Sequence, residues 1–150
     1  MSKPVRNVWE PLVVSDVTEN VGVKTLTVPT GSQYHVMSLY VKVVASATEG
    51  NRQMVVEACD SANAVIDQVR AGAVQAAEAT RFYAFHPSGE NMSAFIDTDF
   101  ITTAIPASWV LNAGEYVKVW DNNETDPETG EGDETADDVL VYMRVLSRGV

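Results

Sequence analysis

Alternating apolar and polar residues near the end of the chain predict two β-strands. From Tyr116 to Trp120, after an Ala113-Gly114 turn signal, valines alternate with longer polar or aromatic side chains. Residues Val139 to Leu146 alternate in the same way. We interpret the two strands as a hairpin whose loop, Asp121 to Asp138, contains nine carboxylates and no basic residue. The loop is expected to be solvated, because so dense a charge cannot be packed.

Further strand patterns lie between turn-forming residues in the body of the chain. They occupy Val23–Val28, Tyr34–Ala45, Gln53–Cys59, Val65–Arg70, Thr80–Phe85 and Phe100–Ile105. Thr48 to Asn51 is a turn signal, so the second and third of these strands are predicted to form another hairpin. In all, about eight or nine short strands predict an all-β fold, an antiparallel and jelly-roll-like β-sandwich.

Residues Ala71–Ala79 are rich in alanine and are the one stretch with real helix propensity. The stretch is short and holds Gly72 near its start, so two interpretations stay open. It forms either a helical turn or a loop of small residues that crosses the end of the sandwich.

The N-terminal residues 1–20 are predicted to be an extended arm or an edge strand, and residues 21–150 a single β-sandwich domain with the acidic loop 121–138. Proline cannot donate a backbone hydrogen bond, so a strand that holds it belongs at a sheet edge. A free arm would expose Val8, Trp9, Pro11 and Leu12 as a surface for a partner. In the alternative, the arm folds back on its own sheet.

Composition limits the class of protein and its partners. The chain has 150 residues, 45% of them hydrophobic, which suits one domain with its own core. The net charge is −11, although the residues outside Asp121–Asp138 hold 12 acids against 10 bases. A body without a basic excess that also carries an acidic loop would repel phosphate backbones, so we expect no direct binding to nucleic acid.

The single cysteine and the N-terminus indicate a cytoplasmic site of synthesis. Cys59 is the only cysteine, so neither an internal disulfide nor a cysteine zinc site is expected, and the thiol is predicted to be buried. The N-terminus lacks the apolar core of a signal peptide, and no run reaches the roughly 20 apolar residues of a membrane span. No membrane association is expected.

The sequence contains no motif of a known catalytic site, and we expect no enzymatic activity and no cofactor. His35 and His86 lie far apart in the chain and are interpreted as polar residues at strand ends. Asp121, Asn123 and Thr125 take the first, third and fifth positions of a calcium loop, but Asp126 and Gly132 replace the glycine and glutamate that such a loop needs. No metal site is predicted.

Aromatic residues suggest an alternative function, a carbohydrate-binding platform. The candidates are Trp9, Trp109, Trp120, Tyr34, Tyr40, Tyr83, Tyr116 and Tyr142. Aromatic residues in sheets are more often core residues or cross-strand pairs, which is the preferred interpretation.

Two groups of short blocks resemble small structural proteins of tailed bacteriophages. The blocks are 50–57, 71–77 and 80–85 in the first group, and 105–107, 111–114, 117–121 and 136–139 in the second. In the second group an Ala-Gly turn precedes the strand Val117-Lys118-Val119-Trp120-Asp121, and Ala136-Asp137-Asp138 opens the last strand. The resemblance covers roughly residues 36 to 146, and its motifs are structural.

The resemblance implies a non-enzymatic virion component, above all a capsid decoration or cement protein. Its implied partner is the major capsid protein of the same virion, which it would bind on the capsid exterior. A homotrimer at a symmetry axis is the expected assembly. A tail, head-fibre or head-to-tail component is the alternative virion position.

Overall fold

The computed structural model describes residues 8–19, 22–47, 52–89, 99–121 and 137–150. Within these residues the protein is all-β, with ten strands and no helix. The strands are β1 (Glu10–Asp16), β2 (Lys24–Thr27), β3 (Ser32–Val44), β4 (Met54–Cys59), β5 (Val65–Arg70), β6 (Thr80–His86), β7 (Phe100–Ala104), β8 (Val110–Leu111), β9 (Tyr116–Asp121) and β10 (Asp138–Gly149).

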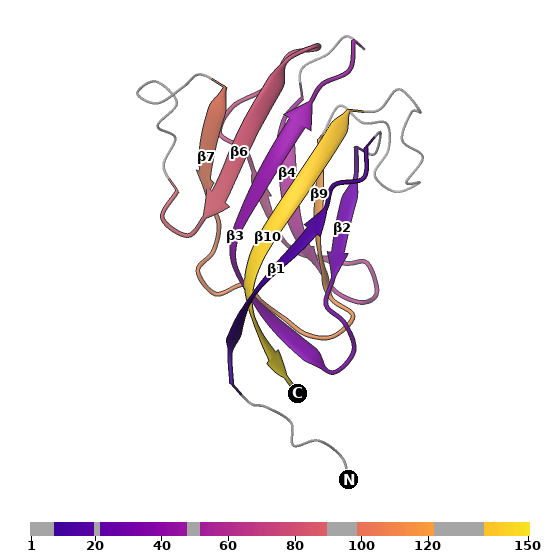
Figure 1. Ribbon diagram of the computed structural model, residues 1–150, viewed down its shortest axis with the longest axis vertical. Coiled ribbons are helices and arrows are strands. Elements are labelled where there is room, and N and C mark those ends of the chain that lie inside the picture. Colours follow the sequence, from indigo (N-terminus) through magenta and orange to yellow (C-terminus); the bar gives the residue numbers. More distant parts are fainter. Residues whose placement is uncertain (1–7, 20–21, 48–51, 90–98, 122–136) are drawn as a thin grey trace.

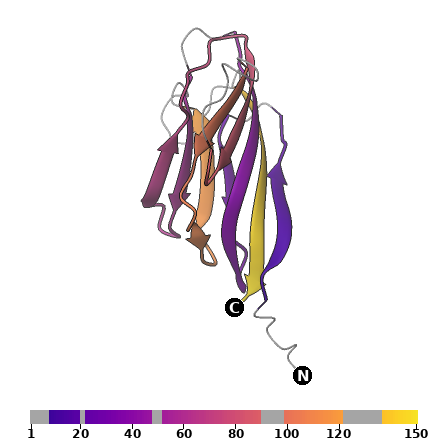
Figure 2. The same ribbon diagram turned by 90° about the vertical axis from the view of Figure 1, so that its left-hand side faces the viewer.

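The strands form two sheets, which lie in two layers (Figures 1 and 2). The larger sheet has the order β1-β10-β3-β6-β7, with β8 also paired to β3, and the smaller sheet has the order β2-β9-β4-β5. Valine-rich strands with one apolar face account for this arrangement, because each sheet buries that face against the other. The long central strands β3 and β10 make the most extensive pairing.

The hydrophobic core lies between the layers and draws on both sheets. Strand β3 contributes Val36, Leu39, Val41 and Val43, all at most 1% exposed. Val117 and Val119 of β9 join the same core from the other sheet. The alternation noted in the sequence therefore marks the buried faces of β3 and β9 correctly, whereas β4 is buried on both faces.

Neither predicted hairpin forms, because the two strands of each predicted pair lie in different sheets. Strand β9 pairs with β2 and β4 in the smaller sheet, whereas β10 pairs with β1 and β3 in the larger one. Likewise β3 and β4 lie in different sheets, so the chain crosses between the layers after β9 and after β3. The physical reason is that alternation identifies a strand with one buried face, and strands on opposite sides of a core share this pattern.

One strand pair is parallel, contrary to the antiparallel prediction. Strand β7 runs alongside β6 in the same direction, with Phe82 opposite Phe100 and Phe85 opposite Thr103. A parallel pair needs a connection long enough to return the chain to the start of the first strand. The segment 87–99 is long enough to do so.

The acidic loop is shorter than predicted, and both of its ends are buried. Asp121 is the last residue of β9 and is 0% exposed, while Asp137 is 1% exposed and Asp138 opens β10. The expectation of a solvated loop is therefore wrong for Asp121 and Asp137. The other predicted loop residues, 122–136, and the calcium candidates Asn123 and Thr125 lie outside the described residues.

A buried polar network holds the chain next to Asp137. The Nε atom of Arg52 donates to Asp137 Oδ2 at 2.5 Å, and both side chains are 2% exposed. The backbone N–H of Ser46 donates to Asp137 Oδ1 at 2.6 Å. This ion pair joins residues 85 positions apart in the sequence. The Asp137 carboxylate thus connects the residue before β10 with Arg52, which lies just before β4.

The alanine-rich stretch Ala71–Ala79 is a loop that runs from β5 in the smaller sheet to β6 in the larger one. The interpretation as a crossing loop is confirmed, and the helical turn is wrong. Gln75 explains why the loop is ordered without a helix: its backbone exchanges two 2.7 Å hydrogen bonds with Arg52. Its buried side chain donates to Ala79 O and accepts from the Tyr83 hydroxyl.

Candidate interface at the β1 edge

The edge strand β1 and the residues just before it hold the four side chains that the sequence analysis named as a candidate partner surface. Valine-rich β1 pairs with β10 along its whole length, from Glu10 opposite Ser147 to Asp16 opposite Val141. Its other side is an edge of the larger sheet (Figure 1). Pro11 is compatible with this position, since edge strands tolerate a missing N–H. The segment Glu10–Asp16 thus belongs to the sheet of its own chain, and residues 1–7 of the predicted arm lie outside the described residues.

Of the four predicted interface residues, three have exposed side chains, and the fourth, Trp9, packs its ring against its own sheet. Val8 is 62% exposed, Leu12 is 43% exposed and Pro11 is exposed. Trp9 is half-buried: its ring meets the His35 ring edge-on at 6.2 Å, and the Arg148 guanidinium lies 4.5 Å from its centroid. Trp9 therefore fastens the start of β1 to its own sheet.

Two exposed valines extend this surface and were missed in the sequence. Val13 of β1 is 56% exposed, and Val17 just beyond the strand is 44% exposed. Both belong to the apolar run that begins at Val8. Val13 lies opposite Arg144 and alternates with Val14, which packs against the core, so Val13 points to the outer face of the larger sheet. We call Val8, Pro11, Leu12, Val13 and Val17 the β1 surface.

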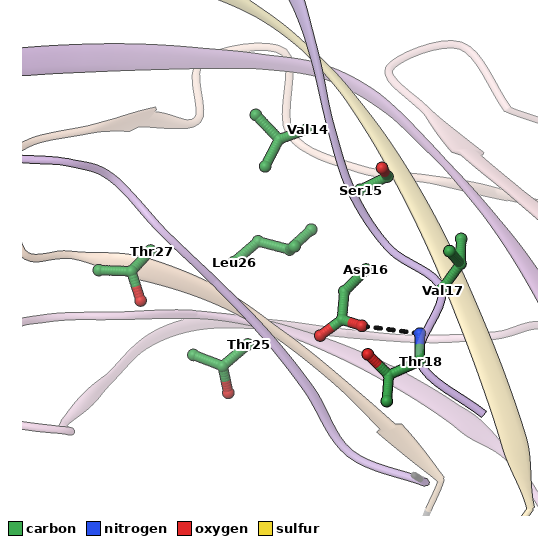
Figure 3. Close-up of a pocket in the computed structure, with 8 residues that line it drawn as sticks. All are labelled: Val14, Ser15, Asp16, Val17, Thr18, Thr25, Leu26 and Thr27. Atoms are coloured by element: carbon green, nitrogen blue, oxygen red, sulfur yellow. Dashed lines mark hydrogen bonds between the residues drawn. The ribbon is translucent and has the colours of Figure 1, made fainter. Parts of the chain in front are cut away.

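A groove of about 500 Å³ lies between β1 and β2, the edge strands of the two sheets (Figure 3). Its lining is Val14, Ser15, Asp16, Val17, Thr18, Thr25, Leu26 and Thr27. Val14 and Leu26 make it apolar between the strands, and hydroxyl groups surround them (Figure 3). An extended peptide could pair with the edge of β1 and place alternate apolar side chains in this groove.

A buried lysine is held beside the groove. Lys24 is 0% exposed, and its Nζ donates to Asp16 Oδ1 at 3.0 Å and to Thr18 O at 2.6 Å. The N–H of Thr18 also donates to Asp16 Oδ1 (Figure 3). This backbone hydrogen bond, followed by the bond and charge of Lys24, lowers the pKa of Asp16 below 3.8. The carboxylate is thus ionised at neutral pH and balances a buried ammonium.

Asp16→Asn is expected to lower the free energy of unfolding at pH 7 by about 1 to 2 kcal/mol. The buried Lys24 ammonium loses its counter-charge, while water around the 35% exposed Asp16 side chain limits the effect. Because folding lowers the pKa of Asp16, its contribution is present above pH 3.8 and is lost as the pH falls through the folded value. Urea denaturation of both proteins from neutral to acidic pH measures the difference.

Lys24→Met is the matched control, because it removes the buried charge and keeps an apolar chain of similar length. It is expected to cost less than Asp16→Asn, since the remaining carboxylate has access to water. A larger loss in Lys24→Met, or a constant Asp16→Asn effect down to low pH, would contradict this account of the pair.

The other candidate residues do not come together in a chemical site. His35 Nε2 lies 2.8 Å from Ala107 O, and His86 ends β6. No group of three or more histidine, cysteine, aspartate or glutamate residues lies close enough to hold a metal ion in the described part of the chain. Cys59 is buried as predicted, and this burial raises the pKa of its thiol.

The predicted aromatic platform is divided between the core and the surface. Tyr34, Tyr83, Trp109 and Trp120 are buried, whereas Tyr40 and Tyr142 are exposed. The core interpretation is correct for Tyr34, Tyr83 and Trp109, whereas Trp120 is buried outside the core cluster, with Lys118 Nζ 5.6 Å from its ring centroid. A platform that uses all eight aromatics is therefore excluded.

Among the residues described, no helix is long and apolar enough to cross a membrane.

Two comparisons with known proteins were negative. No protein-family model matches the chain, and a search of curated proteins finds no match.

Proposed function

We propose that the chain is a non-enzymatic structural protein of a tailed-bacteriophage virion, a decoration or cement protein on the outside of the capsid. The sequence blocks that resemble small phage structural proteins suggest the virion. The observation that carries the proposal is the β1 surface: an edge strand with exposed apolar side chains beside a groove. Proteins usually blunt such edges unless a partner covers them.

We further propose that the two sheets form a jelly-roll-like sandwich. Its support is the nested pairing of the strands: β1 lies next to β10, β2 next to β9, β3 next to β6, and β4 next to β5. Nested antiparallel pairs that alternate between two sheets are the pattern of a jelly roll, a fold found in viral capsid proteins and lectins. The fold agrees with a virion role but does not specify it.

In this proposal an extended segment of the major capsid protein adds a strand to the β1 edge. Backbone hydrogen bonds to β1 would supply affinity, and alternate side chains would contact Val14 and Leu26 in the groove. A contact repeated over many copies would hold neighbouring capsid proteins together. The acidic segment would keep the arrayed copies soluble.

Three copies of the chain are expected to assemble at a symmetry axis of the shell. Light scattering over a dilution series should give a mass about three times the 16.3 kDa of one chain. A monomer at all concentrations would contradict the trimer and leave capsid binding by single copies.

Co-sedimentation with capsids tests the role of the β1 surface. Particles are assembled from a phage genome that lacks this gene, mixed with purified chain and separated by density. We expect Val13→Asp to reduce the bound copies about tenfold or more, because a charge replaces an apolar contact at the interface. The matched control is Val65→Asp on β5, the edge strand of the smaller sheet, where the valine is 52% exposed.

If Val13→Asp and Val65→Asp reduced the number of bound copies equally, β1 would not be part of the capsid interface. Absence of the wild-type chain from particles would overturn the virion proposal. Binding to isolated tails in place of capsids would favour the tail or head-fibre alternative.

A further inference from the structure

Three aromatic rings form a row across the outer face of the larger sheet. Tyr142 of β10 pairs with Tyr40 of β3, and their ring centroids lie 6.4 Å apart. The ring of Phe82 on β6 lies 6.2 Å from Tyr40, at an interplanar angle of 23°. Tyr40 is 39% exposed and Tyr142 is 44% exposed. We call Tyr142, Tyr40 and Phe82 the aromatic row.

The row lies on the face opposite the core. Val41, Val141 and Tyr83, each next in sequence to a member of the row, are 0% exposed and belong to the core. Successive side chains of a strand point to opposite faces, so the three rings lie on the outer face. Packing against the smaller sheet therefore does not account for them.

Two cations flank the row. Lys42 lies opposite Leu140 on one side and Phe82 on the other, and Arg144 follows Tyr142 on the same face of β10. Neither takes part in the ion pairs formed among the described residues. Lys42 and Arg144 thus place one positive charge on each side of the rings, and the Asp138 carboxylate lies on the same face beyond Lys42, opposite Val44.

We propose that the aromatic row binds an oligosaccharide that carries carboxylates on some of its sugars. Aromatic faces pack against the C–H faces of pyranose rings, and tyrosine hydroxyls bond to sugar hydroxyls. Arg144 and Lys42 provide charge-assisted hydrogen bonds to carboxylates on either side of the row. Tyr142 lies opposite Ser15 of β1 and Arg144 opposite Val13, so the row begins one strand away from the β1 edge of the same sheet.

The charges favour this ligand over two other occupants. A second copy docked by a two-fold axis would bring Lys42 and Arg144 against the same cations of its partner, which costs free energy. A nucleic acid has a phosphate on every nucleotide, and two cations are too few to neutralise it against the net charge of −11. A glycan with a carboxylate on alternate sugars needs only one or two cations to neutralise the carboxylates that lie beside the row.

The test is an NMR titration of the ¹⁵N-labelled full chain with a hyaluronan hexasaccharide, in which alternate sugars carry carboxylates. Saturable shifts are expected at amides of β3, β6 and β10. Chitohexaose, a neutral chain of similar sugars, should bind at least about threefold more weakly, because it cannot pair with the cations. Tyr40→Ala and Tyr142→Ala should each weaken hyaluronan binding by about tenfold.

Charge variants separate the role of Arg144 from general electrostatics. Arg144→Gln should weaken hyaluronan binding by about threefold to tenfold. Arg70→Gln removes an exposed arginine from β5 of the smaller sheet and should leave binding unchanged. The spectra themselves show whether each variant is folded.

Four results would overturn the proposal. The first is that no amide shifts appear at up to about 10 mM hyaluronan hexasaccharide. The second is that chitohexaose binds as tightly as hyaluronan, and the third is that Arg144→Gln and Arg70→Gln change hyaluronan binding equally. The fourth is that neither Tyr40→Ala nor Tyr142→Ala weakens hyaluronan binding. Tighter binding of oligothymidylate or of a polyglutamate peptide at the same residues would assign the row to a nucleic acid or an acidic protein and would equally reject a glycan.

Discussion

Asp137→Asn is expected to lower the free energy of unfolding by about 3 to 5 kcal/mol, because it leaves a buried guanidinium without its counter-charge. Arg52 is 1% exposed, and two of its nitrogens, Nε and Nη2, donate to the Asp137 carboxylate. An asparagine has one carbonyl oxygen to share between Arg52 and the Ser46 N–H. Urea denaturation at pH 7 measures the loss.

Asp99→Asn is the matched control for this prediction. Asp99 also faces an arginine, Arg81, at 3.8 Å, but its side chain is 57% exposed. Such surface pairs contribute less than about 1 kcal/mol. If Asp137→Asn cost no more than Asp99→Asn, the buried pair would not be a main support of the fold.

Trp109→Ala is expected to cost about 3 to 5 kcal/mol, the usual loss for a large aromatic removed from a core. The side chain is 5% exposed, and its indole N–H donates to Asp67 Oδ2 at 2.8 Å. Trp109→Phe keeps most of the volume and loses this hydrogen bond, so a smaller cost of about 1 to 2 kcal/mol is expected. Thermal and urea unfolding check both values.

Tyr142→Ala is the control on the surface. Its ring is 44% exposed, so its removal should change stability by less than about 1 kcal/mol. Equal losses at Trp109 and Tyr142 would contradict the division of the aromatics between core and aromatic row.

Strand positions could be predicted from the sequence, whereas strand partners could not. The valine alternation of β9 and β10 marked both strands and their buried faces, since burial on one side repeats every second residue. The pattern is the same for strands in either sheet, which explains the wrong hairpins. The ion pair of Arg52 and Asp137 was also beyond prediction, because only the fold brings together residues 85 positions apart.

The candidate interface shows the same limit. The apolar residues with Pro11 near the N-terminus indicated an edge or an arm, since proline disfavours central strands. The sequence could not show that Trp9 packs against His35 and Arg148, or that Val13 and Val17 are exposed instead. Val13 points to the outer face of the larger sheet, opposite Arg144, whereas Val17 lines the groove beside β2, and only the fold determines these positions.

Imaging of intact phage particles that carry the gene, by cryo-electron microscopy, tests the virion proposal most directly. We expect copies of the two-layered domain on the outer surface of the capsid, with the β1 edge against the major capsid protein and the aromatic row exposed. Particles that lack this density, or that carry the domain only on the tail or with β1 facing away from the shell, would contradict the proposed capsid contact.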